Sequence, residues 1–359
     1  MKIAILTRYS RQGASSRMRY YQYLPWLESE GIEVEVLPLF SDSYVAGLQN
    51  GQKKTIEVIK AYAKRIKVLL TLKSIDLLWI EKELFPWLPA GIERFFLPKN
   101  IPYVLDYDDA VFHYYDLSVN PIVKYFLSGK HPALIKGASL VLVGNDYLGN
   151  FARQANAKAV EFLPTVIDLE RYSFNSHNSS SEATLPPCVG WIGQYSTASF
   201  LAPYKSLFEK MSVAGQARFA AIGINAASLG LPMESIAWSE DTEVTSIKRF
   251  DIGIMPLVDK PFERGKCGYK LIQYMACDLP VVASPVGVNC QLVEHGVNGF
   301  LAETLEEWEQ ALQTLLADAN LREQMGQAGR EKIEREYCIQ VTGPKLAKLL
   351  NGLVNSLKG

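Results

Sequence analysis

Apolar runs of strand length alternate with helical segments along the first half of the chain. The runs are rich in Val, Ile and Leu on both faces, as strands of a buried parallel sheet must be, and they are KIAIL (2–6), IEVEVLPL (32–39), IDLLWI (75–80), YVLDY (103–107) and SLVLVG (139–144). Between the first two runs, Tyr20, Leu24 and Leu27 are spaced at i, i+4 and i+7. This spacing predicts a helix from Gly13 to Glu30 that ends at Gly31, and therefore a β-α-β unit.

A polar stretch interrupts the alternation at residues 173–187, where SFNSHNSSSEATLPP is rich in Ser and Asn and ends in two prolines. This composition predicts a linker. The alternation then restarts with CVGWIG (188–193), ARFAAIG (217–223), SIAWS (235–239), FDIGIMPL (250–257) and LPVVASP (279–285). The whole pattern predicts an α/β fold with two doubly wound, Rossmann-like domains that face a cleft.

The predicted domains are residues 1–172 and 188–340, and a C-terminal helix at residues 341–359 is expected to pack on the first domain. The length of 359 residues supports two domains, because a single hydrophobic core usually stops growing at roughly 250 to 300 residues. In doubly wound sheets, ligands bind outside the carboxyl ends of the strands. Residues just after strands are therefore the first candidates for a functional site.

Composition excludes several classes of protein. Hydrophobic residues make up 48% and charged residues 21% of the chain, which is typical of a folded soluble domain. The net charge of -1 gives no general attraction for nucleic acid, so no nucleic-acid partner is expected. The five cysteines show no C-x-x-C spacing, which disfavours a disulfide framework or zinc site and fits a cytoplasmic location. Arg8 and Arg11 follow the short apolar start, which is therefore neither a signal peptide nor a membrane span.

The segment RGKCGYKLIQYMACDLPVVASPVG, residues 264–287, is the most informative stretch. Two glycines flank Lys266 just before a predicted helix, where backbone N–H groups can approach a phosphate closely. Lys266, Lys270 and Gln273 are spaced at i, i+4 and i+7, so we expect them on one helix face. The pattern alone leaves two interpretations open, a stripe that binds a polar ligand and an ordinary solvated face.

Residues 269–304, YKLIQYMACDLPVVASPVGVNCQLVEHGVNGFLAET, resemble the C-terminal donor-binding region of retaining family 4 glycosyltransferases, which have the GT-B fold. In that family, a helix that ends in a Glu-Ala-Met-Ala-like sequence precedes a Gly-x-Pro-Val-Val-Ala strand. The family's Glu-x7-Glu motif falls on Gly265 and Gln273, so both carboxylates are replaced. Gln273 can still hydrogen-bond the donor ribose. The resemblance implies a donor site that includes Arg264, Gly265, Lys266, Cys267, Gly268, Lys270 and Gln273.

A second segment, GWIGQYSTASFL (190–201), resembles the family's Gly-Arg-x5-Lys donor loop. Gly193 matches the glycine, and Gln194 stands where an Arg usually holds phosphate. Three hydroxyl residues replace the lysine region, namely Ser196, Thr197 and Ser199. The resemblance implies that hydroxyls and backbone N–H groups share phosphate binding with the lysines of the first segment. Helix N-capping is the alternative role of the hydroxyl cluster.

In the first domain, residues 8–34 resemble the family's first strand, loop and helix, and the loop at Gly13 is expected to face the cleft. Arg17 and Arg19 lie at the start of the predicted helix. Cations are unfavourable there, because the helix dipole favours anions at its N-terminus. Either an anionic ligand near Arg17 or a surface position explains this placement.

Three acids lie at the end of the strand in PYVLDYDDAVFH (102–113), namely Asp106, Asp108 and Asp109. Such crowding of negative charge is electrostatically unfavourable unless the carboxylates have a function. The family usually places a His-Asp pair here, with Asp108 at the His position and Asp109 at the Asp position. The resemblance implies that these two catalytic residues orient the acceptor hydroxyl or stabilise an oxocarbenium-like transition state. Metal ligation is the alternative, although GT-B enzymes generally need no metal. His113 is either catalytic or a partly buried loop histidine.

Two further segments supply candidates. Glu81 and Glu83 follow the IDLLWI strand and are either acceptor-side carboxylates or a solvated pair. FLPTVIDLERY (162–172) resembles the stretch that ends the family's first domain, which implies that Thr165 and Asp168 form bonds across the cleft.

Residues 53–73 combine seven Lys or Arg residues with an apolar stripe near Ile56, Ile59, Ala63 and Ile66. A basic amphipathic helix can lie on an anionic membrane. This pattern predicts a peripheral location on the inner face of the cell membrane. The alternative is a domain helix with one solvated basic face.

The resemblance implies transfer of a sugar from a nucleotide diphosphate donor to a hydroxyl of a glycan or lipid-linked acceptor, with retention of configuration. The nucleotide sugar is then a co-substrate, and no cofactor is expected. The two replaced carboxylates leave a second hypothesis, a non-catalytic GT-B-like scaffold that binds nucleotide sugars or glycans. A nicotinamide-dependent dehydrogenase is disfavoured, because no G-x-G-x-x-G follows the first strand of either domain.

Overall fold

A computed structural model describes residues 1–49, 55–173 and 185–358. Most of the predicted linker (174–184), the start of the predicted basic helix (53–54) and the last residue of the predicted C-terminal helix lie outside the described residues. The chain divides into two compact units. The first comprises Met1–Thr165, Arg264–Cys267 and the chain from Thr342 onward, and the second comprises Val166–Glu263 and Gly268–Val341.

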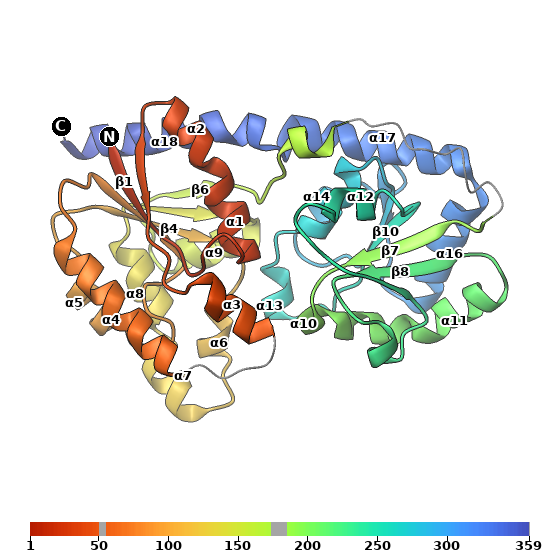
Figure 1. The fold of residues 1–359 in the computed structure, drawn as a ribbon, viewed down its shortest axis with the longest axis horizontal. Coiled ribbons are helices and arrows are strands. Elements are labelled where there is room, and N and C mark those ends of the chain that lie inside the picture. The colour runs from red at the N-terminus through yellow and green to blue at the C-terminus, as the bar shows by residue number, and fades with distance from the viewer. Residues whose placement is uncertain (50–54, 174–184, 359) are drawn as a thin grey trace. The chain divides into compact units, whose positions relative to one another are not determined.

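The first unit contains a six-stranded parallel sheet in the order β2-β1-β3-β4-β5-β6 (Figure 1). Its strands are β1 (Lys2–Leu6), β2 (Glu33–Val36), β3 (Leu77–Glu81), β4 (Tyr103–Tyr107), β5 (Leu140–Val143) and β6 (Val160–Phe162). Every residue of β3 and β5 is buried, as expected for inner strands that are covered on both faces.

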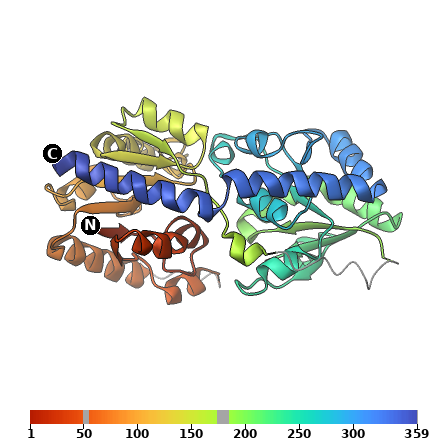
Figure 2. The ribbon, with the colours of Figure 1, turned by 90° about the horizontal axis from the view of Figure 1, so that it is seen from above.

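The helices of the first unit are α1 (Ala14–Arg19), η1 (Tyr21–Tyr23), α2 (Leu24–Ser29), α3 (Asp42–Gln49), α4 (Thr55–Thr71), α5 (Ala90–Phe96), α6 (His113–Asp116), α7 (Pro121–Leu127), α8 (Lys130–Gly137) and α9 (Asp146–Gln154). The last helix of the chain, α18 (Ile339–Lys358), joins this unit from Thr342 onward. Figure 2 shows this part of α18 running along the first sheet. The Thr342 hydroxyl lies 2.9 Å from that of Tyr23, which ties α18 to η1.

The second unit has its own six-stranded parallel sheet, in the order β12-β11-β10-β7-β8-β9. Its strands are β7 (Cys188–Ile192), β8 (Arg218–Ile222), β9 (Glu234–Ile236), β10 (Ile252–Met255), β11 (Val281–Ala283) and β12 (Gly299–Leu301). Its helices are η2 (Leu169–Tyr172), α10 (Tyr195–Ala198), η3 (Ser199–Tyr204), α11 (Lys205–Val213), η4 (Ala227–Leu229), α12 (Glu243–Ile247), α13 (Pro261–Arg264), α14 (Tyr269–Ala276), α15 (Asn289–Leu292), α16 (Leu305–Ala317) and α17 (Ala319–Glu336).

Each sheet has a topological switch point, where successive connections leave in opposite directions. In the first sheet, β1 pairs with β2 on one side and β3 on the other. In the second sheet, β7 lies between β8 and β10. Ligands of doubly wound sheets bind outside the carboxyl ends of the strands at this point. The residues that follow β1 and β3 therefore lie at the switch point of the first sheet, and those that follow β7 lie at the switch point of the second sheet.

The predicted α/β class with two doubly wound sheets is confirmed, but the first predicted helix is wrong in detail. Residues 13–30 form α1, η1 and α2 instead of one helix, because Tyr20 leaves the helical conformation (φ -131°). Pro25 lies in the first turn of α2, where its missing N–H costs no hydrogen bond. Among the described residues, no helix is long and apolar enough to cross a membrane.

Candidate functional site

Glu81 organises the switch point of the first sheet. As the last residue of β3, it accepts hydrogen bonds from the backbone N–H of Arg8 (2.7 Å) and from the Ser16 hydroxyl (2.6 Å). Arg8 lies just after β1, and Ser16 lies in α1. One buried carboxylate thus joins the end of β3 to the chain that leaves β1.

Lys82 follows Glu81 and reaches across to β4. Its amine lies 2.5 Å from Asp108 Oδ1 and 3.0 Å from the Ser15 hydroxyl, which in turn lies 2.6 Å from Asp108 Oδ2. Burial alone would raise the pKa of Asp108, but the Lys82 and Arg19 cations outweigh it and hold this pKa below its usual value. Burial raises the pKa of Asp109, although Lys266 and Lys82 oppose the rise. The pKa values of the two predicted catalytic acids are therefore shifted in opposite directions.

Arg17 and Arg19 are buried in the last turn of α1, so the predicted surface position is wrong. The helix dipole is favourable for cations at that end, which removes the reason to expect an anion near Arg17. Arg19 forms an ion pair with Asp106 and donates a hydrogen bond to the Leu163 carbonyl (2.6 Å). Burial of the Asp106 carboxyl outweighs this ion pair and raises its pKa to about 6.

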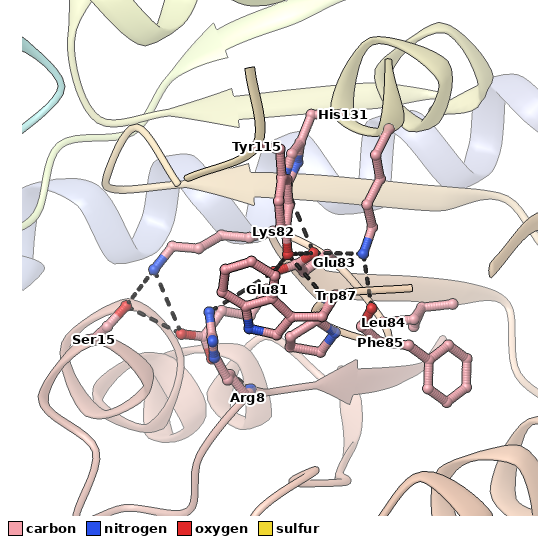
Figure 3. A network of polar contacts seen from close by, with 12 residues as sticks. Arg8, Ser15, Glu81, Lys82, Glu83, Leu84, Phe85, Trp87, Tyr115 and His131 are labelled. Atoms are coloured by element: carbon pink, nitrogen blue, oxygen red, sulfur yellow. Dashed lines mark hydrogen bonds and ion pairs between the residues drawn. The ribbon is translucent and has the colours of Figure 1, made fainter. Parts of the chain in front are cut away.

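Glu83 belongs to a second buried polar network in the same unit (Figure 3). It pairs with Lys130 (2.6 Å) and accepts a hydrogen bond from the Tyr115 hydroxyl (2.9 Å). Lys130 also pairs with Glu93 (2.7 Å), and Arg8 lies 3.8 Å from Glu83. The interpretation of Glu81 and Glu83 as a solvated pair is therefore wrong, because both carboxylates are buried and bonded.

The remaining first-unit candidates are His113, Gly13 and Thr165. His113, at the start of α6, bonds through Nδ1 to Asp116 (2.8 Å) and through Nε2 to the Tyr147 hydroxyl (2.7 Å). Gly13 is the N-cap of α1, and a Cβ there would overlap the Tyr9 side chain. Thr165 is buried at the end of the unit's main segment.

The segment Arg264–Cys267 packs within the first unit, next to the acidic turn. The Cys267 thiol donates to the Asp108 carbonyl (3.0 Å), and the Asn145 side-chain amide donates to the Lys266 carbonyl (2.9 Å). A Cβ on Gly265 would lie 2.8 Å from the Ala110 backbone nitrogen, so close packing already requires this glycine. Lys266 also precedes α14, so the prediction that it shares a helix face with Lys270 and Gln273 is wrong.

In the second unit, Lys270 of α14 lies beside the chain that leaves β7. Its amine is 4.3 Å from the Trp191 ring centroid and 3.3 Å from the Thr197 hydroxyl. A Cβ on Gly193 would lie 2.8 Å from the Lys270 amine and 2.5 Å from the Trp191 ring. Lys270, Gly193 and Thr197 are thus brought together at the switch point of the second sheet.

The other second-unit candidates lie around α10 and α14. Gln194 is the N-cap of α10 without a side-chain cap bond, and Ala198 is the N-cap of η3. The N-capping alternative for the hydroxyl cluster is therefore wrong for these two helices. Gln273 is buried and donates to the Tyr172 hydroxyl (3.2 Å), so it does not lie on a solvated face. Gly268 has φ +67°, a conformation that favours glycine at the N-cap of α14.

Within the described ranges, no group of three or more His, Cys, Asp or Glu side chains could hold a metal ion. The sequence interpretation missed Lys82, Ser15 and Lys130. The only local signal for Lys82 was its position between two acids directly after an apolar strand, since Asp108 and Lys130 lie far along the chain.

Comparison with known proteins agrees with this architecture. Residues 233–318 match the family model of Glycosyl transferases group 1. Over 78 residues the chain is 33% identical to N-acetyl-alpha-D-glucosaminyl L-malate synthase of Bacillus anthracis, a match that spans 21% of this chain and only 20% of that enzyme.

Two solved structures share the fold over almost the whole chain. Sucrose-phosphate synthase from Thermosynechococcus elongatus has a TM-score of 0.76 and 15% identity, and covers 99% of this chain and 100% of its own. HepE of Anabaena, in complex with UDP-glucose, has a TM-score of 0.66 and 17% identity, with 98% and 100% covered.

The fold is therefore that of GT-B glycosyltransferases, as the resemblance predicted. Within it, residues 233–318 match the group 1 glycosyltransferase model. The assignment to family 4 and the retention of configuration stay predictions.

Proposed function

We propose that this protein is a retaining, family 4 glycosyltransferase, which moves a sugar from a nucleotide diphosphate donor to a hydroxyl of a glycan or lipid-linked acceptor. Apart from Arg264–Cys267, the group 1 match falls within the second unit, where the donor is expected to bind. The Anabaena neighbour that shares the fold was solved with UDP-glucose. Both findings support a nucleotide sugar as the donor.

The position of Lys270 carries this proposal. Its amine lies 3.3 Å from the Thr197 hydroxyl and packs against Gly193, just after β7, at the switch point of the second sheet. A cation and a hydroxyl there suit a diphosphate, whose negative charge grows as the glycosidic bond breaks. Gln273 is assigned to the ribose, and the other proposed donor-binding residues are Gln194, Arg264, Gly265, Lys266, Cys267 and Gly268.

Asp108 and Asp109 are proposed to orient the acceptor hydroxyl. The Lys82 cation keeps Asp108 ionised, so this carboxylate can accept a hydrogen bond from a hydroxyl. The leaving phosphate would take the hydroxyl proton in a retaining reaction, so no protein nucleophile is assigned. Gly13, Arg17, His113 and Thr165 stay proposed acceptor-side or cleft positions, and no metal or other cofactor is assigned.

The α4 helix supports a peripheral site on the inner face of the cell membrane. Ile56 and Ile59 are 70% and 64% exposed, so much of the predicted apolar stripe faces away from the core. Lys60 and Lys64 are exposed on the same helix, whereas Arg65 and Leu69 are buried. Exposed isoleucines beside lysines match the surface of an anionic membrane.

The second candidate is a scaffold that binds nucleotide sugars or glycans without transfer. The observation that favours it is the pair Gly265 and Gln273, which replaces both carboxylates of the family motif. Such a protein would bind a donor without breaking its glycosidic bond.

A panel of UDP-, GDP-, dTDP- and CMP-sugars separates the two candidates. Thermal stabilisation by one donor class, together with its hydrolysis or transfer, is expected for the enzyme. Stabilisation without either reaction, unaffected by Asp108→Ala, would establish the scaffold. A flat response to every nucleotide sugar would reject both.

A further inference from the structure

The loop that follows β3 contains two strained residues. Lys82 has φ +62° and Trp87 has φ +66°, and among the described residues only three other non-glycine residues have positive φ, namely Ser74, Asn156 and Asp278. A bulky side chain in this conformation costs roughly 1 kcal/mol or more. Such a conformation persists only where the surrounding structure imposes it.

Other side chains form hydrogen bonds with the backbone between Lys82 and Trp87. Glu93 accepts from the N–H groups of Leu84 and Phe85, both at 3.0 Å. Lys130 donates to the Phe85 carbonyl (2.7 Å), and Tyr62 donates to the Pro86 carbonyl. Figure 3 shows Glu83, Leu84, Phe85 and Trp87 of this loop together with Tyr115. The loop is therefore fixed by polar contacts from α4, α5 and α8.

These contacts hold one exposed aromatic ring in place. The backbone N–H of Trp87 donates to the Tyr115 hydroxyl (3.0 Å), and the rings of the two residues meet edge to face, with their centroids 5.3 Å apart. The Trp87 side chain is nevertheless 55% exposed, whereas Trp79, Trp191 and Trp308 are fully buried. The buried charged groups of this network thus fix the position of an indole that is largely outside the core.

Polar groups of both signs lie next to the Tyr115 ring that the indole contacts. The Tyr115 hydroxyl donates to Glu83 (2.9 Å), and the Arg8 guanidinium lies 3.8 Å from the Glu83 carboxylate. Donors and acceptors beside an exposed flat ring are what a sugar needs, because its hydroxyls form hydrogen bonds while its C–H face packs on an aromatic ring.

We propose that Trp87 is a stacking platform for a sugar ring of the acceptor. This inference rests on the proposed function, and it narrows the acceptor to a molecule with a pyranose ring. The strain at Lys82 and Trp87 is then the cost of holding the platform rigid before the acceptor arrives.

Saturation-transfer NMR with methyl α-glucoside, methyl β-galactoside, methyl N-acetyl-β-glucosaminide and maltose tests the platform. We expect signal from at least one sugar in the wild type, an about tenfold weaker affinity in Trp87→Ala, and a smaller loss in Trp87→Phe. Tyr125→Ala, which removes an 82% exposed ring of α7, is the matched control and should bind like the wild type. Equal affinity in Trp87→Ala, or no binding by any sugar, would overturn the proposal.

Thermal stabilisation by the nucleotide-sugar panel, measured on the same variants, separates this inference from the proposed function. Stabilisation by a donor should survive in Trp87→Ala, which also shows that the variant is folded. If sugars bind at Trp87 but no nucleotide sugar stabilises the protein, the platform stands and the transferase proposal fails. If donors bind and react while Trp87→Ala keeps the wild-type acceptor KM, the platform fails and the transferase stands.

Discussion

The Lys82 amine lies 2.5 Å from Asp108 Oδ1, and both side chains are largely shielded from water. The ion pair joins the residue after β3 to the turn after β4, next to the Ser15 hydroxyl of α1. The same amine lies 3.8 Å from Glu81 Oε1, so one buried cation serves two buried carboxylates.

Lys82→Met should lower the free energy of unfolding by about 3 kcal/mol, because it leaves a buried carboxylate without its partner. Asp108→Asn should also destabilise, and the double variant should lose less than the sum of the two. Urea unfolding at pH 7 measures this cycle. Because the folded pKa of Asp108 is lowered, the pair stabilises above the ordinary Asp pKa and is lost as pH falls through the folded value. Strictly additive losses would show that the two groups do not interact.

His131 should make the protein acid-sensitive. Burial lowers the pKa of His131 to about 4, although Glu83 opposes the shift, while a His in the unfolded chain has its ordinary pKa of 6.5. As pH falls from 6.5 towards 4, the unfolded chain gains a proton that the folded one does not, so stability is lost, by up to about 3 kcal/mol. His131→Asn should lack this component, so the difference between the wild-type and variant unfolding free energies should change across that window. Parallel pH profiles would contradict the assignment.

Gly265→Ala should destabilise by about 1 to 3 kcal/mol. The new Cβ would lie 2.8 Å from the Ala110 backbone nitrogen, which cannot move like a flexible side chain. Gly91→Ala in α5 is the matched control, because a Cβ there meets nothing within 4 Å. Thermal unfolding compares the two. A Gly265→Ala protein as stable as Gly91→Ala would show that the packing on Ala110 is loose.

Serine at Ile56 and Ile59 should weaken binding to phosphatidylglycerol-containing vesicles, because these two side chains are exposed apolar groups of α4. Glutamine at Lys60 and Lys64 should weaken it as well, and added salt should act in the same direction. Val213→Ser removes a 90% exposed side chain of α11 and is the control. Vesicle sedimentation measures binding, and the membrane proposal fails if the wild type stays in the supernatant.

The sequence predicts most of the fold, because apolar runs such as KIAIL and YVLDY are buried on both faces. It misses β6 and β12, which have three residues each and are partly exposed, so their apolar pattern is weak. It also misses the break after Arg19, where Tyr20 turns out of the helix although the i, i+4 spacing continues.

The candidate site was harder to predict than the fold. The acids Asp106, Asp108 and Asp109 stand out in sequence, but their cations Arg19 and Lys82 come from other strands and helices. Glu83 looks like a surface acid until folding brings Lys130 beside it. Local spacing carries no information on such pairs, since they depend on which strands become neighbours.

The affinity for the nucleotide sugar that stabilises the wild type most, measured by titration calorimetry on Lys270→Ala, tests the central claim most directly. Lys270→Ala should bind about tenfold or more weakly, because the amine beside Gly193 and Thr197 is assigned to the diphosphate. Asp108→Ala should keep donor affinity while losing transfer, and Lys205→Ala, an exposed lysine of α11, should keep both. Wild-type donor affinity in Lys270→Ala would contradict the account.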